Sequence, residues 1–199
     1  GVSGFAFGLV AAAIWVQALS PAQTAALIVA YALLVQGYAV WRLRASIVPA
    51  RLWPFVAGSA IGIPIGLGLL KLASATQLKL GVAILLVLFS LYNLVRPKMP
   101  SVSWAGRLGD SLAGVLNGVL GGATGLAGIL VVIWSSIRGW PPNEQRAVFQ
   151  PAGVATFVMC LLAFGATGLI SNDTIRLCAI GLPALLLGTA AGWALYSKL

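Results

Sequence analysis

The residues with the clearest chemical potential lie between Asn117 and Gln150, where polar side chains alternate with glycines. The stretch from Asn117 to Gly128 reads NGVLGGATGLAG. On a helix of 3.6 residues per turn, Asn117, Gly121, Gly125 and Gly128 would share one face. That face would be nearly bare of side chains. We therefore expect a surface on which a small, oxygen-rich anion can approach the backbone closely.

Further polar side chains extend this candidate anion site. Thr124 lies at the edge of the glycine face, and Arg146, Gln150 and Gly153 recur at i, i+4 and i+7, which places them on one helix face. A purely structural role stays open for two of these polar residues. Interhelical hydrogen bonding explains Gln36 equally well, and capping beside Glu144 explains Arg146. The candidate anion-binding residues are Ser3, Gln36, Asn117, Gly121, Gly122, Thr124, Gly125, Arg146 and Gln150.

The sequence offers no set of residues for catalysis or for holding a metal. It contains no histidine and only three carboxylates, Asp110, Glu144 and Asp173, all predicted close to helix ends. We therefore expect neither an enzyme nor a bound metal or other cofactor. Cys160 and Cys178 lie in apolar runs without a paired-cysteine motif and are interpreted as buried thiols.

Composition places the chain in a membrane. It is 60% hydrophobic and only 8% charged, whereas soluble domains carry about 25% charged residues. The net charge of +9 does not indicate a nucleic-acid partner, because the basic residues form short clusters between apolar runs, as membrane-flanking charges do. Cation transport usually requires Asp or Glu near the centre of a span. Here the spans offer mainly hydrogen-bond donors, which favours an anion.

Seven segments are long and apolar enough to cross a bilayer, which takes about 20 residues. The fifth is too long for one straight span, and its glycines predict a break or kink between about Gly121 and Gly128. The seven predicted spans are 1–19, 22–41, 53–70, 77–95, 109–136, 146–170 and 174–197.

A degraded internal repeat divides the chain. A Gly-rich helix, a plain helix and a helix with glycines four residues apart follow one another twice, ending at Gly58 to Gly66 and at Gly188 to Gly192. Such spacing lets helix backbones pack closely. We predict an all-α, polytopic helical bundle with a first repeat at 1–95, a basic connecting loop at 96–107 and a second repeat at 108–199. The second repeat lacks a fourth helix, so seven spans are expected here and eight in the full chain.

Basic residues between the spans predict the orientation. Counting loops alternately gives seven basic residues on one side, including Arg42, Arg51 and Arg176, and five on the other, including Arg138 and Arg146. We therefore predict that the N-terminus and the loops after the second, fourth and sixth spans are cytoplasmic.

Two motifs resemble a known family. Residues 120–128, LGGATGLAG, and 138–147, RGWPPNEQRA, resemble the second-repeat signature of the TauE/SafE family of sulfite and organosulfur-anion exporters. The first half is similar, so the resemblance covers nearly the whole chain. It departs at 6–10, AFGLV, where members usually have consecutive glycines followed by a proline.

The resemblance implies two four-helix repeats and export of a small anion, sulfite or an organosulfonate, across a bacterial cytoplasmic membrane. The expected partners are that anion and the lipid bilayer, and a homodimer stays open. From the residues alone, an anion channel and a membrane subunit that transports nothing remain alternatives.

Overall fold

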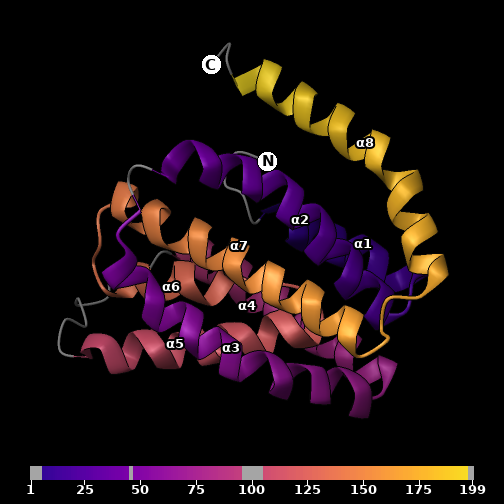
Figure 1. The fold of residues 1–199 in the computed structure, drawn as a ribbon, viewed down its shortest axis with the longest axis horizontal. Helices are drawn as coiled ribbons and strands as arrows, with labels where there is room; N and C mark the ends of the chain where they lie inside the picture. Colours follow the sequence, from indigo (N-terminus) through magenta and orange to yellow (C-terminus); the bar gives the residue numbers. More distant parts are fainter. Residues whose placement is uncertain (1–5, 45–46, 96–104, 197–199) are drawn as a thin grey trace.

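The computed structural model describes residues 6–44, 47–95 and 105–196. Within these ranges the chain is helical and contains no strand (Figure 1). The helices are α1 (Ala6–Ala18), α2 (Pro21–Leu43), α3 (Pro49–Leu72), α4 (Ala75–Val95), α5 (Gly106–Thr124), α6 (Ile129–Ile137), α7 (Pro142–Ala166) and α8 (Asn172–Tyr196).

Five of the described helices are long and apolar enough to cross a membrane: α2, α3, α4, α7 and α8. Large apolar side chains point outward from them, including Leu72, Leu80 and Leu187. An apolar exterior suits lipid, because lipid tails are as apolar as leucine. The prediction of a polytopic, all-α membrane protein is confirmed.

The helix starts follow from local sequence chemistry. Pro21, Pro49 and Pro142 each occupy the first turn of a helix, where the missing N–H has no intrahelical partner to lose. Before α2, the Ser20 hydroxyl accepts from the Gln23 N–H at 3.2 Å, and the Gln23 side chain accepts from the Ser20 N–H at 3.1 Å. This capping box sets the start of α2.

The predicted break in the fifth segment is confirmed, and the structure adds a reversal of direction. The segment divides into α5 and α6, because Gly125 (φ 76°) and Gly128 (φ 98°) adopt left-handed backbone conformations that favour glycine. The Trp134 indole nitrogen donates to Asp110 at 2.7 Å. A helix that continued straight would hold these two residues roughly 36 Å apart. Residues 106–137 therefore form a helical hairpin that begins and ends on one side.

This hairpin corrects two details of the sequence interpretation. Gly125 and Gly128 do not lie on one helix face with Asn117 and Gly121, because α5 ends at Thr124. The hairpin also changes which loops share a side of the bundle.

The starts of α3, α5 and α7 lie together at one end, which we call the arginine end. Arg51 of α3 is ion-paired with Glu144 of α7, and Arg138 with Asp110 of α5. The prediction that Arg138 lies on the opposite side from Arg51 is therefore wrong. Because α7 is one continuous helix of 25 residues, Arg176 beyond it lies at the other end, also contrary to prediction.

The closest helix contact joins α3 to α5, which run parallel. Glycines alternate across it: a Cβ on Gly114 would lie 2.5 Å from the Phe55 carbonyl oxygen, and one on Gly122 would lie 2.6 Å from that of Ile63. The glycines of α3 in turn face the α5 backbone. The predicted packing role of Gly58 to Gly66 is confirmed. The matching glycines of α8, Gly188 and Gly192, face open space.

Candidate functional site

Asn117 is the central polar residue of the bundle. Its side chain is fully buried, and its amide oxygen accepts from the Gly128 N–H at 2.6 Å. Its amide nitrogen donates to the hydroxyls of Ser59 and Thr156, both at 3.3 Å. One side chain thus joins α3, α5 and α7 to the residue that precedes α6.

This junction lies at a depth in the bundle that matches the middle of a membrane. Asn117, Ser59 and Thr156 come 11, 10 and 14 residues after the starts of their helices at the arginine end. At 1.5 Å per residue, these positions lie roughly 15–21 Å from that end. From the membrane surface to the midplane is about 20 Å, which is one headgroup layer plus half of the ~30 Å hydrocarbon core. The α6 helix, of nine residues, therefore starts in the protein interior and runs back to the arginine end.

Gln36 and Gln150 form a second polar region, between α2 and α7. Both side chains are buried, at 2% and 6% exposure, roughly 10–12 Å from the arginine end. A Cβ on Gly153, one turn after Gln150, would lie 3.0 Å from the Gln36 amide oxygen. The amide oxygen of Gln150 is buried without a hydrogen-bond partner among the described residues. A buried polar atom of this kind normally marks a place for a ligand or water.

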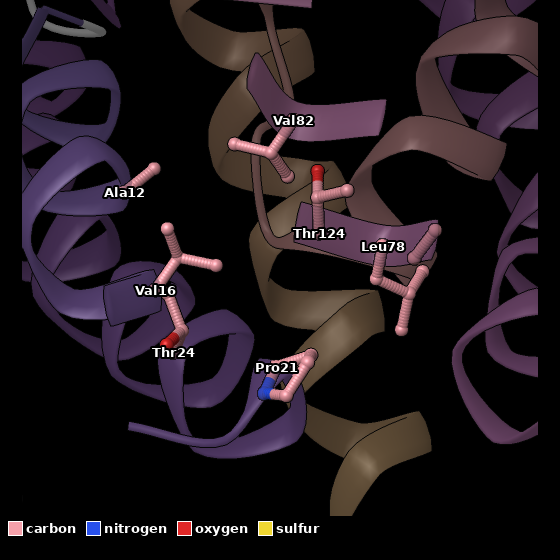
Figure 2. A pocket seen from close by; sticks show the side chains of 8 residues that line it. Ala12, Val16, Pro21, Thr24, Leu78, Val82 and Thr124 are labelled. Atoms are coloured by element: carbon pink, nitrogen blue, oxygen red, sulfur yellow. The ribbon is translucent and has the colours of Figure 1, made fainter. Parts of the chain in front are cut away.

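Thr124 lies apart from both regions. Its hydroxyl donates to the Leu120 carbonyl at 2.8 Å and accepts from the Leu126 N–H at 3.2 Å, so it caps the end of α5. It also lines a small cavity of about 10 Å³ with Thr24. Figure 2 shows Ala12 and Val16 on one side of this cavity and Thr124 on the other. The volume suits about one water molecule, and the lining is mostly apolar, so the cavity does not fit a sulfur oxyanion.

The other predicted residues occupy different environments. Arg146 is exposed, one helical turn before Gln150. Gly121 faces Ala127, Thr156 and Cys160, while Gly122 and Gly125 contact the backbones of α3 and α2. Ser3 lies outside the described residues. The structure thus brings Gln36 near Gln150 and Asn117 near Gly121, but it does not unite all the predicted residues in one chamber.

Sequence analysis missed a charged cluster at the arginine end. Asp110 accepts from the Trp134 indole and lies 3.5 Å from the Arg138 Nε. The guanidinium carbons of Arg138 and Arg51 lie 5.6 and 5.5 Å from the centre of the Trp140 ring. Reading Asp110 only as a helix-end carboxylate hid this cluster, because its partners are 24 and 28 residues away and meet it only through the hairpin.

The geometry can bind an anion in two ways. The first N–H groups of a helix have no intrahelical partners and carry positive potential, and those of α6 lie in the bundle interior. The buried amides of Gln36 and Gln150 add neutral hydrogen-bonding groups closer to the arginine end. Among the described residues no cluster of three His, Cys, Asp or Glu side chains could hold a metal ion.

Comparison with known proteins agrees with this geometry. No curated protein and no solved structure gave a significant match to the chain. A family model described as "Sulfite exporter TauE/SafE" matches residues 1–199, the whole sequence. The protein therefore belongs to the TauE/SafE family of membrane transporters.

Proposed function

We propose that the protein exports a small sulfur oxyanion, sulfite or an organosulfonate, across the bacterial cytoplasmic membrane. The observation that carries this proposal is the interruption between α5 and α6. Transporters commonly place interrupted helices at the membrane midplane, where the N-terminal end of a half-helix faces an anionic substrate. Here the interruption lies inside the bundle, beside a buried, hydrogen-bonded Asn117.

Within this proposal, Asn117 positions the anion-binding groups. Its amide oxygen is occupied by the Gly128 N–H, and its amide nitrogen by two hydroxyls. The side chain thereby fixes the start of α6, whose next N–H groups face the substrate. Gln150 supplies a direct contact, because its amide oxygen has no hydrogen-bond partner in the part of the chain that the structure describes. That acceptor favours an anion that still carries a proton, such as hydrogen sulfite, or one with an ammonium group.

The order of elements supports two repeats of opposite orientation. A short helix followed by a proline and a long helix occurs as α1–α2 and again as α6–α7. The α2 helix ends at the arginine end and α7 begins there. We therefore propose repeats at 1–95 and 108–199, inverted relative to each other, as in many secondary transporters.

We propose that the arginine end is cytoplasmic. Six described basic residues lie there, against three at the other end, Lys71, Lys79 and Arg176. An excess of this kind is typical of the cytoplasmic side. The six residues are Arg42, Arg44, Arg51, Arg107, Arg138 and Arg146.

The membrane potential can drive such an export. Moving one negative charge outward, down an inside-negative potential, releases about 2.3 kcal/mol per 100 mV. A proton relay would need an Asp, Glu or His within the membrane. The sequence has no histidine, and Asp110 is engaged by Trp134 and Arg138. We therefore expect export without a second ion.

The test is sulfite flux in proteoliposomes under an imposed potassium-diffusion potential at equal pH on both sides. We expect saturable efflux that follows the potential. Efflux without saturation or trans-stimulation would indicate a channel, and absence of flux for sulfite, thiosulfate and taurine would refute the proposal. Efflux that ignores the potential and follows a pH gradient would refute the energetic part.

The role of Gln150 is tested in the same assay. Gln150→Leu should abolish transport without lowering the yield of folded protein, because leucine fills a similar volume between α2 and α7 and removes the polar contact. Gln17→Leu is the matched control, since Gln17 is exposed and donates to the Ala13 carbonyl of its own helix. Wild-type transport by Gln150→Leu would exclude this contact.

A further inference from the structure

The Asp110–Arg138 pair is a buried ion pair that the binding region described above does not include. The side chains are 7% and 15% exposed, and the pair closes the arginine end of the α5–α6 hairpin. We propose that Arg138 is the residue that first binds the transported anion, and that Asp110 occupies its guanidinium while no anion is present. This inference rests on the anion export proposed above.

The geometry of the pair is that of an exchangeable contact. The Arg138 Nε lies 3.5 Å from one Asp110 oxygen, which is longer than the 2.7–2.9 Å of a charge-assisted hydrogen bond. The same Asp110 oxygen accepts from the Trp134 indole at 2.7 Å. Asp110 therefore retains a strong partner when the guanidinium turns away from it. Arg138 gains, in exchange, an oxyanion that its planar fork can bind through two parallel hydrogen bonds.

The surroundings favour an anion at this position. The Arg138 guanidinium lies against the Trp140 ring, with Arg51 against the same ring. The face of the aromatic ring attracts each of the two cations. Two guanidinium groups near one ring form a cationic entrance, and their carboxylate partners, Asp110 and Glu144, keep the empty entrance neutral.

The two ion pairs of this entrance differ in burial, which provides an internal control. Arg51 and Glu144 are 47% and 45% exposed, so water can solvate Arg51 when Glu144 is neutralised. Neutralising Asp110 instead removes the negative charge beside a mostly buried guanidinium, which is unfavourable. A bound anion relieves that penalty. The proposal therefore predicts opposite effects for the two members of the buried pair.

The experiment measures how the thermal unfolding temperature of the purified protein rises with the concentration of sulfite, and of sulfate as a second anion. The concentration dependence gives the affinity for each anion. Asp110→Asn keeps an oxygen for the Trp134 indole but removes the competing charge. We expect it to bind the anion about tenfold more tightly, equivalent to about 1.4 kcal/mol. Arg138→Gln should bind at least about tenfold more weakly. Glu144→Gln should tighten binding less than Asp110→Asn does, because water solvates Arg51, and Asp173→Asn in the exposed pair at the other end should bind like the wild type.

Arg138→Lys keeps the ion pair and the fold but loses the planar fork. It should also bind about tenfold more weakly, and it decides the question even if Asp110→Asn does not fold. Unchanged affinity in Arg138→Lys, or weaker binding in a folded Asp110→Asn, would overturn the inference. If the wild type transports sulfite and the Arg138 variants transport it at the wild-type rate, this inference alone is overturned. A wild-type protein with neither flux nor anion-dependent stabilisation would overturn the proposed function as well.

Discussion

Replacing Gly114 with alanine tests the close contact between α3 and α5 that supports the whole hairpin. The new Cβ would lie 2.5 Å from the Phe55 carbonyl oxygen and 2.8 Å from the Phe55 Cα. Ordinary contacts begin at 3.4 Å, so the two backbones must separate by about 0.9 Å. Neither contact atom is the end of a flexible side chain that could rotate away. Overpacking of this kind costs about 1–3 kcal/mol.

The matched control is Gly68→Ala in α3, where a Cβ would meet nothing within 4 Å. Alanine stabilises a helix by up to about 1 kcal/mol relative to glycine. The two substitutions add the same methyl group, yet we expect effects of opposite sign, separated by about 1–4 kcal/mol.

Thermal unfolding in detergent at one fixed scan rate measures both variants. For a chain of this size, 1 kcal/mol shifts the unfolding temperature by about 2–4 °C. Gly114→Ala should unfold about 2–12 °C below the wild type, and Gly68→Ala at or slightly above it. If Gly114→Ala is as stable as Gly68→Ala, the parallel glycine packing of α3 and α5 is wrong.

Two further predictions concern the hairpin. Asn117→Leu should lower the free energy of unfolding by about 1–3 kcal/mol, because it leaves the buried Gly128 N–H without an acceptor; thermal unfolding measures the loss, and wild-type stability would contradict the central junction. Single cysteines at Arg107 and Asn143, in a background without the native thiols, should react with an impermeant maleimide from the same side of the membrane, and one at Ser171 from the other. Labelling of Arg107→Cys and Asn143→Cys from opposite sides would contradict the hairpin and would support a single crossing of the membrane by residues 109–136.

The membrane class and most helix boundaries could be predicted from the sequence, because both depend on local properties. Runs of apolar residues mark the spans, and the helices that begin at Pro21, Pro49 and Pro142 start within about four residues of the predicted spans. The break after Thr124 was also predictable, since several glycines disfavour a continuous helix. The reversal at the break was not. Composition determines where a helix is weak. The direction of the chain after the break depends on tertiary contacts, such as that between Trp134 and Asp110.

The same limit applies to the candidate site. The sequence identified Gln36, Asn117 and Gln150 as polar residues within apolar spans, and the structure buries all three. It could not show that the Asn117 amide is already bonded by the protein, because its main partner, the Gly128 N–H, approaches only when the chain turns back. Nor could it reveal the buried pair of Asp110 and Arg138, which depends on the same turn. One reversal at two left-handed glycines thus determines both how the protein bonds the Asn117 amide and which guanidinium lies beside Asp110.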